Sequence, residues 1–249
     1  MGLNGVDLRG KVALVTGAGS GLGAATARAF SQAGCAVACL DIDAAAARSV
    51  AGELAAADAE ALPIGCDVSD ADATARAVAA VVERWGRLDV LVNCAAIDHT
   101  RPVAELSIAQ WDAVIAVNLR GPFLLARLAF PIMARQGGGH IVNVASTAAT
   151  RAWANAAAYH ASKWGLVGFS RGLGVEGRPH GIRVTTVIPG GMRTHFFDRF
   201  VEQGIPLPDE RNLQDPAVVA ATILFAVTLP PESAVQEVIV TPLTETSWP

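Results

Sequence analysis

Positive charge is scarce in this sequence, and long apolar runs are absent from it. The chain carries a formal net charge of −4 with a pI of about 5.7, so it has no overall attraction for nucleic acid or an anionic membrane. Its longest apolar run, residues 217–229, is shorter than the roughly 20 residues that span a bilayer. Residues 1–11 lack the cationic and apolar regions of a secretory signal. We therefore expect a soluble protein with no nucleic-acid and no membrane partner.

Cysteine is limited to four positions, none of which belongs to a C-x-x-C pair or to a spacing typical of zinc ligands. Three of the four lie in or beside short apolar segments that predict strands. We interpret them as small core residues of a protein kept in the reducing cytoplasm, and we expect no metal site.

Tyrosine and lysine are scarcer still. The single tyrosine, Tyr159, lies four residues before Lys163, which is one of two lysines. In a helix this spacing places both side chains on one face, one turn apart. A neighbouring cation favours the phenolate and lowers a tyrosine pKa from about 10 toward neutrality. The pair suits proton transfer, although a core tyrosine beside a solvated lysine would show the same spacing.

Apolar residues, by contrast, make up 52% of the chain and occur as short runs that alternate with alanine-rich amphipathic stretches. This alternation predicts right-handed βαβ units and an α/β fold, with one doubly wound parallel sheet (Rossmann fold) of about seven strands and helices on both faces. The predicted strands are Val12–Thr16, Ala36–Leu40, Ala61–Gly65, Val90–Asn93, His140–Val144, Arg183–Ile188 and Glu237–Val240. The predicted helices are Leu22–Ala33, Ala44–Ala57, Asp70–Trp85, Ile108–Ala134, Ala158–Val175 and Pro216–Val227.

Three local features refine this outline. Asp43 is expected to cap the second helix, and Ser69 is expected to open a capping box before the third. The stretch Gly190–Asp215 has no clean period, so we expect a loop or substrate lid there. No Pro-, Gly- or Ser-rich linker divides the chain, and residues 1–249 are expected to form a single dinucleotide-binding and catalytic domain.

A glycine-rich segment, Thr16-Gly-Ala-Gly-Ser-Gly-Leu-Gly23, joins the first predicted strand to the first predicted helix. Glycines let the backbone turn sharply and approach a diphosphate, while the helix N-terminus offers unpaired N–H groups and a positive dipole end. In this position the segment predicts a dinucleotide site.

Asp41 follows the second strand, 18 residues after Gly23. A carboxylate there can accept hydrogen bonds from ribose hydroxyls and repels a 2′-phosphate. No basic residue lies between Gly17 and Gly23 or between Asp41 and Arg48, so the cofactor we expect is NAD, unless Asp41 merely begins the turn into the next helix.

Taken together, these segments resemble the short-chain dehydrogenase/reductase family over essentially the whole chain. The glycine-rich opening is similar to the T-G-x-x-x-G-x-G motif of that family. Tyr159-His-Ala-Ser-Lys163 resembles its Y-x-A-S-K motif, and Ser146 lies 13 residues earlier, as is usual in the family. Asp67-Val68 resembles the pair of residues that contacts adenine in the family, and Asn93-Cys-Ala-Ala96 resembles its N-N-A-G segment. Pro189-Gly-Gly-Met-Arg-Thr194 resembles its P-G-x-x-x-T segment.

The resemblance implies hydride transfer between the nicotinamide and a substrate carbon. It implies that Tyr159 is the general acid and base, that Lys163 lowers its pKa, that Ser146 holds the substrate oxygen, and that Asn118 orients a water leading from Lys163 to solvent. The cofactor-binding residues that it implies are Gly17, Ser20, Gly21, Leu22, Gly23, Asp41, Ile42, Asp67, Val68, Asn93, Ala95, Tyr159, Lys163, Pro189, Gly190, Met192 and Thr194.

Two departures from the family pattern bear on the site and on assembly. Ala96 stands where a glycine usually lines the cofactor. The ending 234–249 lacks the usual glycine-rich V-D-G-G segment, which often helps to build an interface in relatives. A homodimer and a homotetramer both remain open.

The substrate side is less defined. Phe196, Phe197 and Phe200 can cover an apolar substrate or pack a lid helix onto its own domain, and His99, Trp153, Asn155 and His195 are further candidates for the pocket wall. We expect a secondary alcohol or ketone of small to medium size. The alternatives are an NADPH-dependent 3-oxoacyl thioester reductase, which Asp41 disfavours, and a catalytically silent dinucleotide-binding module, which has no need of the Ser146–Tyr159–Lys163 set.

Overall fold

The computed structural model describes residues 7–198, 200, 205 and 207–245, and it contains a seven-stranded sheet in which every pairing is parallel. The strands are β1 Val12–Thr16, β2 Ala36–Asp41, β3 Ala61–Gly65, β4 Val90–Asn93, β5 Gly139–Val144, β6 Ile182–Pro189 and β7 Glu237–Val240. They lie in the order β3-β2-β1-β4-β5-β6-β7, so the chain winds outward from β1 and then outward again from β4. This arrangement confirms the predicted doubly wound α/β fold.

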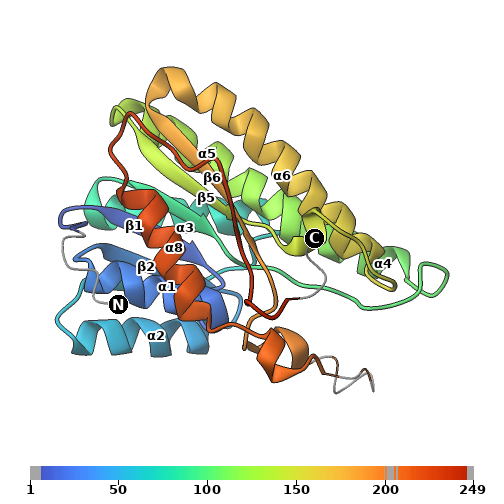
Figure 1. Ribbon diagram of the computed structural model, residues 1–249. Helices are drawn as coiled ribbons and strands as arrows, with labels where there is room; N and C mark the ends of the chain where they lie inside the picture. The colour runs from blue at the N-terminus through green and yellow to red at the C-terminus, as the bar shows by residue number, and fades with distance from the viewer. Residues whose placement is uncertain (1–6, 199, 201–204, 206, 246–249) are drawn as a thin grey trace.

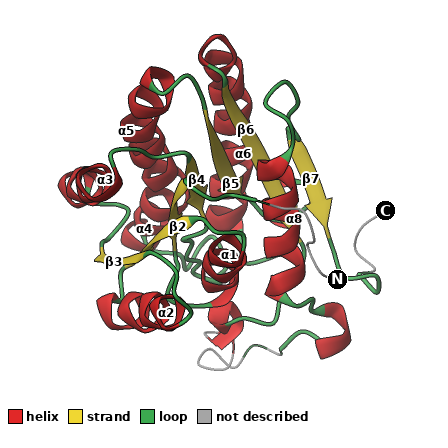
Figure 2. Cartoon of the chain, turned by 90° about the vertical axis from the view of Figure 1, so that its left-hand side faces the viewer, coloured by secondary structure: helices red, strands yellow, loops and turns green. Residues whose placement is uncertain are grey.

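Helices cover both faces of the sheet (Figures 1 and 2). The helices are α1 Gly21–Gln32, α2 Ala44–Ala56, α3 Ala71–Trp85, α4 Ile108–Ile115, α5 Gly121–Arg135, α6 Ala157–Gly177 and α8 Pro216–Thr228. Phe30 of α1 belongs to one core cluster together with residues of α2 and α8. Leu125 of α5 belongs to a second cluster, on the other face, with residues of α3 and α6. Because both faces are covered, β1 is buried at every position, as its nearly continuous apolar sequence predicts.

The helix starts test two predictions. Asp43 caps α2 as expected, since its side chain accepts the N–H groups of Ala45 and Ala46. The capping box predicted at Ser69 is wrong, because Asp70 caps α3 instead. The Ser69 hydroxyl donates to Asp67 Oδ1 at 2.7 Å and is therefore committed to the preceding turn.

The single helix predicted over 108–134 contains a π-helical turn, Ala116–Arg120, between α4 and α5. Within it the N–H of Gly121 bonds to the carbonyl of Ala116, five residues earlier. Pro122 follows in the first turn of α5 and has no N–H to offer the carbonyl of Asn118, four residues before it. That carbonyl therefore receives no α-helical hydrogen bond.

The helical run Ile108–Arg135 is long and apolar enough to cross a membrane by length and composition alone. In the structure 44% of its most apolar window is buried, and it packs against α3 and α6. Core helices of globular proteins pass the same test, so this run is weak evidence for a membrane span.

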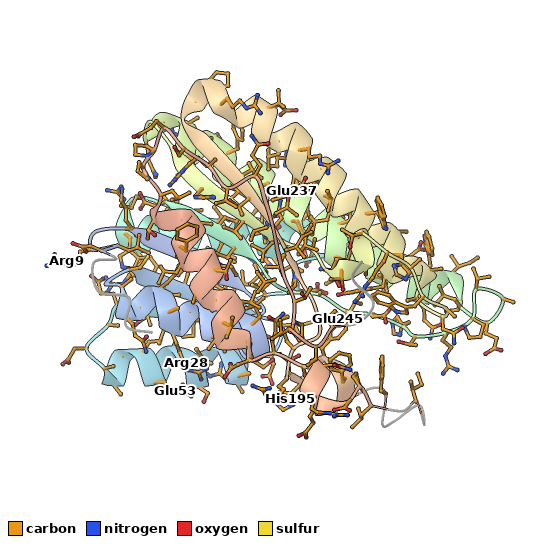
Figure 3. The ribbon with its side chains drawn as sticks, in the orientation of Figure 1. Arg9, Arg28, Glu53, His195, Glu237 and Glu245 are labelled. Atoms are coloured by element: carbon orange, nitrogen blue, oxygen red, sulfur yellow. The ribbon has the colours of Figure 1, made fainter. Side chains whose placement is uncertain are left out.

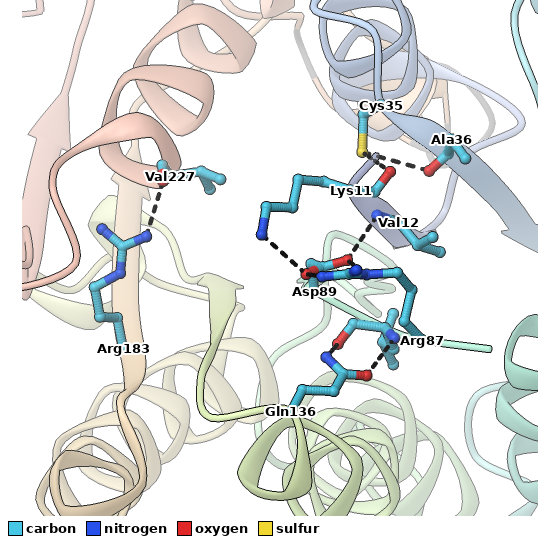
Figure 4. A network of polar contacts seen from close by, with 10 residues as sticks. Lys11, Val12, Cys35, Ala36, Arg87, Asp89, Gln136, Arg183 and Val227 are labelled. Carbon is cyan, nitrogen blue, oxygen red and sulfur yellow. Dashed lines mark hydrogen bonds and ion pairs between the residues drawn. The ribbon is translucent and has the colours of Figure 1, made fainter. Parts of the chain in front are cut away.

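A polar network ties β1 to β4 at their amino ends, away from the edge where the strands end (Figure 4). Asp89 accepts the Val12 N–H at 2.9 Å and two N–H groups of Arg87 at 2.7 and 2.6 Å, and Lys11 Nζ lies 3.4 Å away. Burial by itself would raise the pKa of Asp89, but these donors and cations outweigh burial and lower it. The second lysine of the chain thus belongs to a structural network.

Candidate active site

A cavity of about 690 Å³ opens at the carboxyl ends of the strands, the edge at which parallel α/β sheets bind ligands. Of the catalytic and cofactor-binding residues predicted from the sequence, Asn93 and Asn118 are buried and are not among the residues that line it. The others line it: Gly17, Ser20, Gly21, Leu22, Gly23, Asp41, Ile42, Asp67, Val68, Ala95, Ser146, Tyr159, Lys163, Pro189, Gly190, Met192 and Thr194.

The turn from β1 to α1 requires glycine at two positions for different reasons. Gly17 has a φ of +64°, and a Cβ there would lie 3.1 Å from the backbone of Ala95. A Cβ at Gly23 would lie 2.0 Å from the carbonyl oxygen of Gly17, so α1 can begin against the turn only with glycine.

The N-terminus of α1 borders the cavity with its backbone donors. Ser20 occupies the N-cap position, yet its side chain makes no capping bond to any residue that the structure describes. The first N–H groups of the helix and the positive end of its dipole are therefore available to an anion. A diphosphate fits this place.

Asp41 ends β2 beside the same turn. Its Oδ2 accepts the N–H of Gly19 at 2.9 Å and its Oδ1 accepts the N–H of Asp43 at 3.0 Å. Each carboxylate oxygen can accept a further hydrogen bond and Asp41 lines the cavity, which suits a pair of ribose hydroxyls. Ile42, Asp67 and Val68 extend this rim, and Asp67 Oδ1 accepts the backbone N–H of Ser69 at 2.8 Å.

Asn93 supports the cavity from behind. Its Nδ2 donates to Asn143 Oδ1 at 2.8 Å, which links β4 to β5 inside the fold. The adjoining segment is held by Thr16, whose hydroxyl oxygen accepts the N–H groups of Cys94 and Ala95 at 3.0 Å each. The structure thus brings Ala95 to the cavity surface and leaves the Asn93 side chain in a buried polar network.

Tyr159 and Lys163 share one face of α6, as their spacing predicts. The Lys163 ammonium lies 5.6 Å from the centre of the Tyr159 ring and donates to the carbonyl of Val144 at 2.8 Å. Lys163 is only 2% exposed, and this burial lowers its pKa from 10.5 to about 8. The cation therefore stays charged at neutral pH beside the chain's single phenol.

Ser146 follows β5 and begins the short helix Thr147–Ala149. Its Oγ accepts the N–H of Ala148 at 3.1 Å, so the hydroxyl hydrogen is left to donate into the cavity. The strand-end turn and the cavity position are thus compatible roles for one residue.

Asn118 is fully buried in the π-helical turn. Its Oδ1 accepts the N–H of Ile97, and its Nδ2 donates to the carbonyl of Ile97 and to Ser162 Oγ, at 2.8, 2.8 and 3.1 Å. This side chain ties the loop after β4 to α6, one residue from Lys163. Asn118 is therefore a buried tie inside the fold and is not exposed on a helix face.

Aromatic residues cover the other end of the cavity. Phe196 lies 5.5 Å from the Tyr159 ring, centre to centre, and continues into a chain of edge contacts with Phe197 and Phe200. Trp153 and His195, both proposed from the sequence, also line the cavity. His99 and Asn155 are not among its lining residues.

Sequence reasoning missed several polar residues of the cavity wall, among them Asp98, Thr100, Arg151 and Glu245. The Thr100 hydroxyl donates to Asp98 Oδ2 at 2.9 Å, and Arg151 forms an ion pair with Glu245. The only sequence signal for any of them was that Arg151 lies five residues after Ser146, close to a predicted site residue.

In the described part of the chain no three His, Cys, Asp or Glu side chains gather as a possible metal site. The predicted lid falls partly outside the described residues, at 199, 201–204 and 206.

Known proteins share this architecture. A family model for short chain dehydrogenases matches residues 11–204. D-threitol dehydrogenase of Mycolicibacterium smegmatis is 44% identical over 73% of this chain and 70% of its own. A metagenomic short-chain oxidoreductase, solved in complex with NADP, is 37% identical with a TM-score of 0.82, over 94% of this chain and 97% of its own.

A 7α-hydroxysteroid dehydrogenase, solved with NADH and 7-oxo glycochenodeoxycholic acid, is 26% identical with a TM-score of 0.88, over 97% of both chains. Such likenesses extend across the sheet and the helices that cover it. They confirm the resemblance read from the motifs. The chain belongs to the short-chain dehydrogenase/reductase family of nicotinamide-dependent oxidoreductases.

Proposed function

We propose that this protein is an NAD-dependent oxidoreductase that moves a hydride between the nicotinamide and the carbon of a secondary alcohol or ketone, with Tyr159 as general acid and base. The observation that carries the proposal is that Ser146, Tyr159 and Lys163 line one cavity, with the ammonium 5.6 Å from the phenol ring centre. A silent binding module has no use for a proton donor beside a buried cation.

The proton chemistry follows from these neighbours. The Lys163 charge favours the Tyr159 phenolate, which removes the hydroxyl proton of an alcohol and returns it to the oxygen in the reverse reaction. Ser146 donates its hydroxyl hydrogen to the same substrate oxygen and stabilises the charge that develops there. When bound, the nicotinamide supplies the acceptor or donor of the hydride.

Asn118 serves the proton path through its backbone. Its side chain is committed to Ile97 and Ser162. Its carbonyl lacks an α-helical donor because residue 122 is proline. We assign to this carbonyl the water that leads from Lys163 toward solvent.

The preference for NAD rests on charge. Asp41 sits beside the glycine turn, where the ribose of the adenosine would lie, and its carboxylate repels a 2′-phosphate. Among the described residues that line the cavity, the lysine and arginine cations are Lys163 and Arg151, and neither adjoins Asp41 in the sequence or in a recorded contact. The absence of a lysine or arginine beside Asp41 in the described lining supports the preference for NAD.

The substrate we propose is a small or medium-sized molecule with free hydroxyl groups. The cavity combines an aromatic cover with polar side chains, among them Asp98 and Thr100. The similarity to a D-threitol dehydrogenase supports the same class, because threitol is an uncharged polyol. The segment 190–215 is proposed to act as the lid over this end.

Assembly into a homodimer or homotetramer is proposed from an apolar surface. Ile108, Trp111, Phe123 and Trp164 are exposed on neighbouring helices α4, α5 and α6. A cytoplasmic location is proposed because all four cysteines are free thiols.

The proposal is tested with the purified protein and its Tyr159→Phe variant. Reduction of NAD⁺ and NADP⁺ is measured with a panel of secondary alcohols and polyols that includes threitol. Loss of the phenol should lower kcat by roughly 10²- to 10⁴-fold, the usual contribution of a general acid or base. NADH should still bind, which shows that the variant is folded. Undiminished turnover by Tyr159→Phe would overturn the mechanism.

A further inference from the structure

A largely buried ion pair forms part of the cavity wall. Arg151 Nη2 lies 3.0 Å from Glu245 Oε2, and Nη1 donates to Oε1 at 3.3 Å, so the guanidinium meets the carboxylate with both terminal nitrogens. The two side chains are 18% and 14% exposed. Nη2 also donates to Thr147 Oγ1 at 3.2 Å.

The partners come from distant segments. Arg151 follows the short helix that begins after Ser146, whereas Glu245 lies in the segment that leaves β7. That segment is anchored on its way, because the Thr244 hydroxyl donates to the carbonyl of Arg211 and Pro242 packs against Gly190. Figure 3 shows Glu245 among the side chains that lie beyond the carboxyl end of the sheet, where the cavity lies. The atypical C-terminal segment therefore contributes a residue to the site.

The pair decides the charge of this wall. A lone arginine fork in a cavity binds a carboxylate or phosphate through two parallel hydrogen bonds. Here Glu245 occupies the fork. An anionic substrate would have to displace Glu245 or lie beside a buried carboxylate of like charge, and both are costly. A neutral hydroxyl compound meets neither obstacle.

One donor of the pair is left over. Arg151 Nε is buried and has no hydrogen-bond partner among the residues that the structure describes. A buried donor without an acceptor is unfavourable.

We propose that Glu245 sets the substrate class by neutralising Arg151, so that the cavity admits uncharged hydroxyl compounds and rejects hydroxy acids of the same size. This inference rests on the proposed function, since selection is read through the dehydrogenase reaction. Arg151 and Glu245 are specificity-determining residues in this proposal, and neither takes part in proton transfer.

Lactate and propane-1,2-diol test it, because they differ in having a carboxylate or a hydroxymethyl group on the carbinol carbon. The measured quantity is kcat/KM for the diol divided by kcat/KM for lactate. Glu245→Gln should lower this ratio roughly ten- to hundredfold, the range of a hydrogen bond to a charged group. Arg151→Gln leaves an unpaired carboxylate and should raise it.

Opposite shifts of this ratio in the two variants distinguish an effect of charge from detachment of the C-terminal segment. If either substitution simply detached that segment, the ratio would change in the same direction in both variants. The matched control is Glu237→Gln, which breaks the ion pair with Arg171. That pair is 68% and 33% exposed and does not line the cavity, so the ratio should keep its wild-type value.

A second readout does not depend on turnover. Lactate, compared with sodium chloride at equal ionic strength, should raise the unfolding midpoint of Glu245→Gln but not of the wild type, because a ligand stabilises the state that binds it. Unchanged ratios and unchanged midpoints in both variants would overturn the inference. A lactate-dependent midpoint in Glu245→Gln, with no turnover of any alcohol by the wild type, would support the charge selection and refute the proposed reaction.

Discussion

Replacing Lys163 by methionine removes the cation beside Tyr159, and we expect this variant to lose turnover while it resists unfolding better at neutral pH. Lys163 is 2% exposed, and burial lowers its pKa from 10.5 to about 8. The folded protein therefore holds an ammonium in a place that disfavours its charge. Methionine has a similar length and no charge to bury.

The magnitude follows from the pKa. A fall from 10.5 to about 8 corresponds to roughly 3 kcal/mol, at about 1.4 kcal/mol per pKa unit. Below pH 8 both the folded and the unfolded chain hold the proton, so the folded state carries this whole cost. Between pH 8 and 10.5 the folded state has released the proton while the unfolded chain still binds it, so stability rises with pH and the cost disappears.

The methionine substitution also removes a hydrogen bond. The carbonyl of Val144 loses the donor that lies 2.8 Å from it, which costs about 1–3 kcal/mol. At pH 7 the variant should therefore be up to about 2 kcal/mol more stable than the wild type, and near pH 10.5 it should be less stable by about 1–3 kcal/mol. The difference between the two proteins should change by roughly 3 kcal/mol across this range.

Urea unfolding of the cofactor-free proteins at intervals from pH 7 to pH 10 measures this difference. Lys11→Met removes the other lysine of the chain and controls for the loss of an ammonium as such. A difference between wild type and Lys163→Met that stays constant over the whole range would refute the reasoning from burial. The loss of NAD⁺ reduction in the same variant tests the proposed role of the cation separately.

Three further substitutions test other parts of the structure. Asp41→Asn keeps an acceptor for the Gly19 N–H but removes the charge, so the ratio of the NAD⁺ and NADP⁺ dissociation constants should shift roughly tenfold toward NADP⁺ in binding titrations. Burial lowers the pKa of His140 to about 3, whereas the unfolded histidine binds a proton below about 6.5. Stability should therefore fall as the pH drops from about 6.5 toward 3, and urea titrations of His140→Asn at several pH values should show a smaller fall. Asp89→Asn should cost about 2–3 kcal/mol at pH 7, because Arg87 loses its partner. That cost should begin to shrink as the pH falls below about 4, where the unfolded carboxylate gains its proton, and should be lost once the pH passes the lower pKa of the folded Asp89.

The fold was readable because its constraints are local and repeated. Strands covered on both faces must be apolar at nearly every position, so β1, Val12–Thr16, appears in the sequence as four apolar residues followed by a threonine. The turn after β1 tolerates only glycine at Gly23, where a Cβ would meet the Gly17 carbonyl at 2.0 Å. Asp43 and Lys163 could be placed for similarly local reasons. Asp43 precedes a helix and caps it, and Lys163 lies one helical turn after Tyr159.

Two kinds of feature were harder to predict from the sequence: an extra residue within a helical turn, and the choice of N-cap between two neighbouring residues. The apolar period continues through 108–134 and conceals the π-helical turn around Asn118, for which Pro122 was the available signal. Ser69 and Asp70 both suit an N-cap, and the sequence alone does not state that Asp67 draws Ser69 into the preceding turn. The burial of Asn93 likewise depends on Asn143, which lies 50 residues away on the next strand.

The substrate end of the cavity lies beyond such reasoning for a physical cause. Arg151 and Glu245 are 94 residues apart, and nothing near either residue marks it as half of a pair. Catalysis by proton transfer needs a phenol and an ammonium at a fixed short distance, which one helix can supply through sequence-adjacent turns. Selection of a substrate needs only that some charge or shape lie opposite it, and loops from anywhere in the chain can supply that. The proposed proton-transfer chemistry can therefore be predicted from the spacing within one helix, whereas the proposed choice of substrate depends on contacts between distant segments of the folded chain.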